Sequence, residues 1–131
     1  MSAPSVQTGQ PGGGFNALFA TERAKRGLPV MAVNAQLGSA ARAHAQDMQT
    51  KGYFAHQSPS GSTLPNRVDR AGYCYSRISE NIAKGQRTET EVMDAWLASP
   101  GHLKNMIDPT VREYGFAQAG TVWVLVMGAR C

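Results

Sequence analysis

The amino-acid sequence predicts an α+β domain, a three-layer α-β-α sandwich in which an antiparallel central sheet is flanked by helices. Apolar residues recur at helical spacing in four segments that precede the C-terminal part of the chain. An alternating segment at Tyr114 and Phe116, a turn at Ala119-Gly120 and a continuous apolar run over Val122–Met127 predict two strands. Because a strand without polar alternation is covered on both faces, helices are expected on both sides of the sheet.

Two helices are predicted in the first half of the chain. The first runs from about Phe15 to Arg26, because Gly27 and the following Pro29 are helix-ending residues. The second begins after Asn34, a favourable N-cap residue, and ends at Gly52. Its apolar face repeats at intervals of four, four and three residues through Leu37, Ala41, Ala45 and Met48. Both helices are therefore expected to pack on the core through one apolar face.

Two shorter helices are predicted in the middle of the chain. The segment over residues 63–71 has apolar positions at i, i+4 and i+7, namely Leu64, Val68 and Ala71. Further on, Thr88 and Glu91 have the capping-box spacing that opens a helix, which explains Glu91 as a capping residue. Pro100-Gly101 is expected to break this fourth helix. His102 is therefore predicted to lie outside it, directly after its end.

Length and composition indicate one globular domain. The chain has 131 residues, of which 42% are apolar and 17% charged. Residues 1–14 are rich in glycine and polar residues and are predicted to be a flexible tail without a signal peptide, and residues 15–131 form the domain. No apolar run approaches the roughly 20 residues of a transmembrane helix. The net charge is +4, but the basic residues are spread along the chain, which argues against nucleic-acid binding.

The two cysteines predict a disulfide between Cys74 and Cys131. A cysteine at the end of a terminal strand is well placed to be held by a partner, and the cross-link would stabilise the fold by roughly 4 kcal/mol. Two unrelated buried thiols are the alternative. A disulfide implies an oxidising compartment, so we expect a secreted protein, extracellular or periplasmic, with its signal removed.

The three histidines are candidates for different roles. His44 lies on the apolar face of the second predicted helix and is interpreted as a hydrogen-bonded core residue. His56 lies in a loop, from which its side chain can point into a cleft. Glu80 has small and apolar neighbours, where a partly desolvated carboxylate requires a partner. His56, Glu80 and His102 are therefore predicted to form one polar site, which acts in binding or as a buried hydrogen-bond network.

Four segments, in this order and at these spacings, resemble a known family: Phe54–Pro59, Ala71–Tyr73, Ser79–Ala83 and Trp96–Asn105. They are similar to the bacterial branch of the CAP superfamily, whose name comes from cysteine-rich secretory proteins, antigen 5 and pathogenesis-related 1 proteins. Its domain is also called the SCP domain. The resemblance extends over about residues 15–131 and implies a secreted α-β-α sandwich with a cleft that two histidines and two acidic residues line.

The resemblance assigns residues of this chain to that cleft. The two histidines correspond to His56 and His102, and the first acidic residue corresponds to Glu80. At the place of the second acidic residue this chain has Ser99, so the group is one carboxylate short. In relatives the two histidines bind a divalent metal such as zinc, which makes His56 and His102 the candidate metal ligands here. No cofactor is otherwise required.

Three functions are consistent with these residues. The first is a secreted binding module, expected to be a monomer, whose cleft holds a lipid, a peptide or a cell-envelope fragment. The second is a hydrolase or metal-dependent enzyme, with His56 or His102 as general base and Glu80 orienting it. Against it, the chain has no Gly-x-Ser-x-Gly nucleophile motif and no His-Glu-x-x-His zinc motif. The third is a structural domain of the cell envelope without a small ligand.

Overall fold

A computed structural model describes residues 14–131 and shows one four-stranded sheet at the centre of the molecule. The strand order is β1 (Ala32–Val33), β3 (Glu113–Ala119), β4 (Val122–Arg130) and β2 (Tyr75–Lys84). β4 is antiparallel to both β2 and β3. The predicted α+β sandwich is confirmed, with one difference: the short β1 runs parallel to β3, so the sheet is mixed rather than antiparallel throughout.

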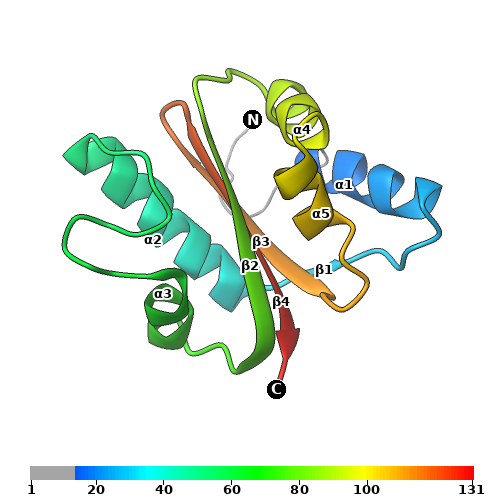
Figure 1. Cartoon of the computed structure of the whole chain (residues 1–131), viewed down its shortest axis with the longest axis horizontal. Helices are drawn as coiled ribbons and strands as arrows, with labels where there is room; N and C mark the ends of the chain where they lie inside the picture. Colours follow the sequence, from blue (N-terminus) through cyan, green and yellow to red (C-terminus); the bar gives the residue numbers. More distant parts are fainter. Residues whose placement is uncertain (1–13) are drawn as a thin grey trace.

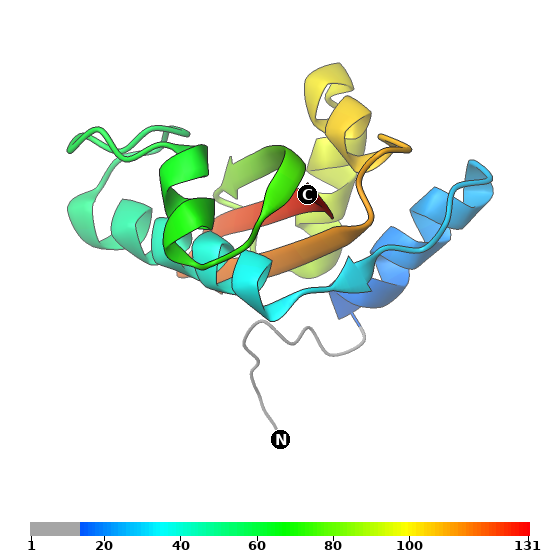
Figure 2. The same ribbon diagram turned by 90° about the horizontal axis from the view of Figure 1, so that it is seen from below.

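Helices cover both faces of the sheet, as predicted. Figures 1 and 2 show α2 (Ala35–Lys51) and α3 (Leu64–Arg70) on one side, and α1 (Gly14–Lys25), α4 (Glu89–Leu97) and α5 (Pro100–Met106) on the other. β4 contributes alternate residues to two separate cores. Trp123, Leu125 and Met127 belong to the core under α1 and α4. Val122, Val124 and Val126 belong to the core under α2 and α3.

Side-chain caps begin three of the predicted helices. The Asn34 side chain accepts a hydrogen bond from the amide of Leu37 and caps α2, and Gly52 ends α2 in the left-handed conformation. Thr63 caps α3, and Thr88 caps α4 by accepting from the Glu91 amide. The carboxylate of Glu91 accepts a hydrogen bond from the backbone amide of Arg87. In a complete capping box it would accept from the amide of Thr88, one residue later.

His102 lies after the end of α4, as predicted, but within a further helix, α5, that was not predicted. Pro100 does end α4, but it also begins α5, where proline is tolerated because the first turn has no amide partner. His102 is therefore in the first turn of α5.

The longest strand, β2, was not among the two strands that the sequence predicts. Ile78 and Ile82 do alternate along it, but the inward position between them is Glu80, whose charge conceals the period of two. In the structure Glu80 is opposite Val126 of β4, at the edge of the sheet. The carboxylate is therefore positioned by a strand rather than by a loop.

The Cys74–Cys131 disulfide is confirmed. It joins the residue before β2 to the residue after β4, with the two Cα atoms 5.5 Å apart. The backbone amide of Cys131 also donates to the carbonyl of Cys74. The tail predicted over residues 1–14 lies outside the described residues, except for Gly14, where α1 begins. Within residues 14–131, none of the helices combines the length and apolar character needed to cross a membrane.

Candidate functional site

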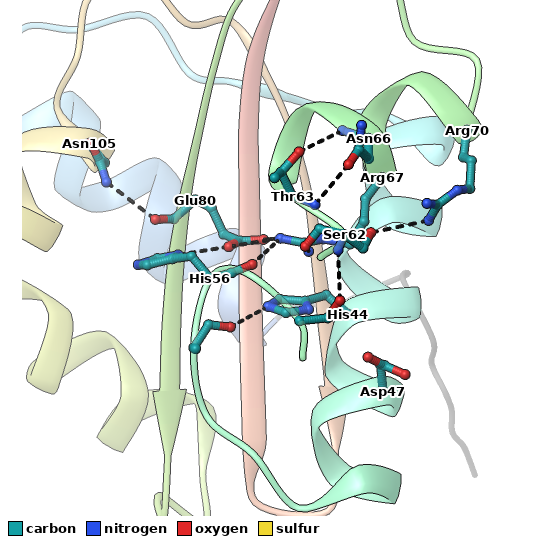
Figure 3. Close-up of polar contacts among 12 residues, drawn as sticks. His44, Asp47, His56, Ser62, Thr63, Asn66, Arg67, Arg70, Glu80 and Asn105 are labelled. Atoms are coloured by element: carbon teal, nitrogen blue, oxygen red, sulfur yellow. Dashed lines mark hydrogen bonds and ion pairs between the residues drawn. The ribbon is translucent and has the colours of Figure 1, made fainter. Parts of the chain in front are cut away.

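Glu80 is a buried carboxylate at the centre of a polar cluster (Figure 3). Its side chain is only 2% exposed. One oxygen, Oε1, lies 2.8 Å from His56 Nδ1, and Nη2 of Arg67 donates to Oε1 at 3.3 Å and to Oε2 at 3.1 Å. A buried carboxylate requires such partners because it has lost its hydration. Both oxygens of Glu80 are therefore engaged by the protein itself.

Arg67 holds this cluster together, although it was not among the predicted site residues. Its side chain is 4% exposed, and besides Glu80 it donates to the carbonyl oxygens of His56, at 2.8 Å, and Ser62, at 3.2 Å. The signal was present: Arg67 lies three residues after Leu64 and four before Ala71, on the apolar face of α3. A charged residue on that face predicts a buried partner of opposite charge.

His56 is the exposed member of the cluster. It lies in the loop between α2 and α3, and its side chain is 59% exposed. The hydrogen bond to Glu80 raises the pKa of His56 above its usual value, which burial only partly opposes. The protonated ring donates through Nδ1 to Glu80 and has no partner at Nε2 within residues 14–131. In its protonated form, which Glu80 favours, His56 therefore presents an N–H donor to solvent.

The stabilising contribution of His56 is expected to decrease as pH rises. Because the folded pKa lies above the unfolded value of about 6.5, this contribution is fully present below about pH 6.5 and is lost as pH rises through the folded pKa. Urea unfolding of the wild type and His56→Gln at a series of pH values tests this. The stability difference between the two proteins should shrink with rising pH, and a constant or growing difference would contradict the pairing with Glu80.

His102 and Ser99 form a second pair, on α5. His102 Nδ1 lies 2.9 Å from Ser99 Oγ. Burial, and then the charge of nearby His56, lower the pKa of His102, so its ring is neutral at neutral pH. No hydrogen bond joins His102 to Glu80 within the described part of the chain. The structure therefore brings His56 to Glu80 and Ser99 to His102 as two separate pairs.

Two asparagines connect these pairs. The Asn81 side chain donates to the carbonyl of His102 at 3.1 Å. Asn105 of α5 donates to Asn81 Oδ1 at 2.9 Å. It also donates to the carbonyl of Glu80 at 3.4 Å, as Figure 3 shows. These bonds hold α5 against the edge strand β2, which places both pairs at the same edge of the sheet. Neither asparagine was among the predicted site residues, although both lie in the segments that carry the family resemblance.

His44 lies beneath the loop that carries His56. Its ring is buried, and Nε2 is 2.8 Å from the carbonyl oxygen of Ala55, the residue before His56. Burial lowers the pKa of His44 and favours its neutral form. Its contact agrees with the predicted role as a hydrogen-bonded core residue, and it anchors the loop from the side of α2.

The donors do not form a complete zinc site. Within residues 14–131, His, Cys, Asp and Glu residues form no group of three or more that is arranged to hold a metal. Glu80 is engaged with Arg67 and His56, and Ser99 replaces a carboxylate by a neutral hydroxyl. Two imidazoles alone fall short of the three or four protein ligands typical of zinc. The expectation of a metal at His56 and His102 is not confirmed.

The mixed sheet between two layers of helices is the architecture of an SCP-type α+β sandwich. The model of the CAP family, the cysteine-rich secretory protein family, matches residues 17–121, and the chain belongs to this family.

The chain is similar to several bacterial proteins. It is 40% identical over 104 residues to the uncharacterized protein YkwD of Bacillus subtilis (strain 168), covering 78% of this chain and 40% of YkwD. An extracellular SCP-domain protein of Bacillus anthracis str. Ames has a TM-score of 0.85 and 27% identity, over 88% of this chain and 39% of that one. The chain thus spans less than half the length of these two relatives.

An outer surface protein of Borrelia burgdorferi has the same fold. Its TM-score is 0.82 at 22% identity, and the match covers 88% of this chain and 90% of the Borrelia protein. This fold therefore makes up nearly the whole of that solved chain.

Proposed function

We propose that this chain is a secreted binding domain whose cleft holds a cell-envelope fragment that carries a carboxylate, such as a wall peptide. His56, Glu80 and His102 form the cleft, with Ser99 beside His102. One observation carries the proposal: Glu80, engaged by Arg67, lies 2.8 Å from His56 Nδ1 and favours the protonated form of that ring, in which the exposed Nε2–H is a charged donor. A carboxylate is the acceptor that complements this donor.

The neighbourhood of His56 suits a ligand with both polar and apolar parts. Phe54, two residues before His56, is 46% exposed, although large aromatic side chains are usually buried. On the other side of the cleft, the Nε2 of the neutral His102 ring can accept or donate. A peptide, with carboxylate, amide and apolar groups, matches this set better than a purely apolar lipid.

Export is part of the proposal and is supported by two observations. The single disulfide is typical of an oxidising compartment. The similar proteins of Bacillus anthracis and Borrelia burgdorferi are described as an extracellular and an outer surface protein.

Binding is favoured over hydrolysis by the way the polar groups are engaged. Glu80 accepts hydrogen bonds through both oxygens and is not free to act as a base. Ser99 Oγ lies close to the neutral His102 ring, but no carboxylate orients that ring within residues 14–131. A nucleophile and base without an orienting group lack one part of a hydrolytic triad.

Titration with a soluble wall peptide, followed by amide resonances in ¹H–¹⁵N spectra, tests the proposal. We expect saturable shifts around residues 54–57 and 99–105. His56→Ala should weaken binding by about tenfold or more, because it removes a charge-assisted hydrogen bond. Gln57→Ala, which alters the exposed neighbour of His56, is the matched control and should bind like the wild type.

A second peptide separates the possible outcomes. The same peptide with its carboxylates amidated should lose most of its affinity. If the acid and amide forms bind equally, or if His56→Ala binds like the wild type, the proposal is wrong. Absence of any saturable shift would favour a structural envelope domain.

A further inference from the structure

Ser99 begins α5 but does not cap it. As the N-cap residue it is placed to accept a hydrogen bond from an amide of the first turn, yet its side chain makes no such bond. Thr63 and Thr88, at the same position of α3 and α4, both accept from an amide three residues further on. The hydroxyl of Ser99 instead lies 2.9 Å from Nδ1 of His102. Its hydrogen bond is therefore with a ring of the cleft rather than with the backbone of the helix.

The ring of His102 is held in place by its surroundings. The buried indole of Trp96 lies beside it, with the two ring centroids 6.5 Å apart. The His102 carbonyl accepts a hydrogen bond from the side chain of Asn81. Within residues 14–131 the Nε2 atom of His102 has no hydrogen-bond partner. Because a neutral imidazole has one donor and one acceptor nitrogen, the bond to Ser99 decides which of these Nε2 offers to a ligand.

The number of donors favours one direction for this bond. If Nδ1 carried the proton and donated to Ser99, the hydroxyl hydrogen would need a second acceptor, and the described part of the chain provides none within hydrogen-bonding distance. If the hydroxyl donates to Nδ1, its hydrogen is used and the proton of the neutral ring is on Nε2. Ser99 therefore favours an Nε2–H donor on His102. A carboxylate at position 99 only accepts, so it would favour a proton on Nδ1 instead.

We propose that Ser99 is the positioning residue of the cleft: it keeps the His102 proton on Nε2, so that two imidazole N–H donors hold the carboxylate of the ligand. The other donor is Nε2–H of His56, in the loop before α3. Figure 1 shows α3 and α5 over opposite faces of the sheet, with the edge strand β2 between them. Burial and then the charge of His56 lower the pKa of His102, so the two rings are near each other.

A carboxylate complements this arrangement because both of its oxygens only accept hydrogen bonds. One oxygen can accept from the loop side of β2 and the other from the α5 side. The ligand follows from the proposed function, on which this inference rests, whereas the tautomer of His102 is a property of the free chain.

Long-range ¹H–¹⁵N spectra of the histidine rings in the free chain measure the tautomer at neutral pH. We expect the Nε2–H pattern for His102 in the wild type and in Ser99→Thr, which keeps the hydroxyl. Ser99→Asp should give a protonated Nδ1, because a carboxylate only accepts. An Nδ1–H pattern in the wild type, or a wild-type pattern in Ser99→Asp, would overturn the role of Ser99.

Titration with the soluble wall peptide measures the consequence for binding, and Thr88→Ala is the matched control. Ser99→Ala should weaken binding by about fivefold, because one hydrogen-bond donor is no longer fixed, and Ser99→Thr should restore the affinity. Since Ser99 makes no cap bond, Ser99→Ala should keep the urea midpoint of the wild type. Thr88→Ala removes a cap and should lower that midpoint, yet it should bind the peptide like the wild type.

The outcomes distinguish this role of Ser99 from the proposed function. If Ser99→Ala binds like the wild type while His56→Ala binds weakly, the role of Ser99 is wrong and the carboxylate site stands. If the acid and amidated peptides bind equally, or neither binds, the proposed function fails and the two-donor site fails with it, whatever the tautomer of His102. A parallel loss of stability and affinity in Ser99→Ala would give Ser99 a structural role and overturn the proposal.

Discussion

Replacing Glu80 with alanine is expected to lower the free energy of unfolding by about 3–5 kcal/mol, because Arg67 would lose its charge partner in the interior. The side chains of Glu80 and Arg67 are 2% and 4% exposed, so water cannot take the place of the lost carboxylate. The remaining acceptors of Arg67 are neutral carbonyls of the loop that carries His56. The loss should therefore exceed that of an ordinary surface ion pair several-fold.

Urea unfolding of Glu80→Ala measures this cost, and Glu22→Ala is the matched control. Glu22 forms ion pairs on α1 with Lys25 and Arg26, both nearer to solvent, and its loss should cost about 1 kcal/mol or less. Removing both charges, as in Glu80→Ala/Arg67→Met, should restore part of the stability, because no buried charge is then left unpaired. If Glu80→Ala costs no more than Glu22→Ala, the buried pair is not the structural centre of the site.

Elements with one clear local signal were predicted from the sequence. The start and end of α2 follow from Asn34 and Gly52, whose capping roles depend only on neighbouring residues. The apolar run over Val122–Met127 identified β4 as a strand covered on both faces. These signals do not depend on distant parts of the chain.

Three features that depend on distant contacts, namely β2, Arg67 and β1, were not predicted. β2 carries the carboxylate of Glu80 at a buried position. A carboxylate is stable there because Arg67 of α3 lies beside it. The burial of Arg67 was not predicted, because an arginine on a short helix usually faces water. The parallel β1 has only two residues, too few for a periodic pattern, and is held by pairing with β3.

The residues of the candidate site were predicted better than their arrangement in space. Sequence placed His56 in a loop and required a partner for Glu80, and the two do form a hydrogen bond. The position of His102 on α5 depends on packing against β2 through Asn81 and Asn105, which no local pattern encodes. The role of these residues in ligand binding stays a prediction.

Removing the Cys74–Cys131 disulfide is expected to lower the free energy of unfolding by about 4 kcal/mol. The cross-link joins residues 57 apart, and a loop of that length restricts the unfolded chain by about this amount in the chain-entropy description. Denaturant unfolding of Cys131→Ser, and of the wild type with and without reductant, measures the loss. An unchanged unfolding midpoint under reductant would contradict the prediction.

The single variants Cys74→Ser and Cys131→Ser and the double variant should lose nearly the same stability, because each removes the same link. This loss should leave the candidate site intact. β2 and β4 remain paired from Arg77–Ala129 to Lys84–Val122, so Glu80 keeps its place opposite Val126 without the disulfide. The raised pKa of His56, measured by NMR in folded Cys131→Ser, should therefore match the wild type. A lower value would show that the cross-link also holds Glu80 in place, because His56 owes its raised pKa to that carboxylate.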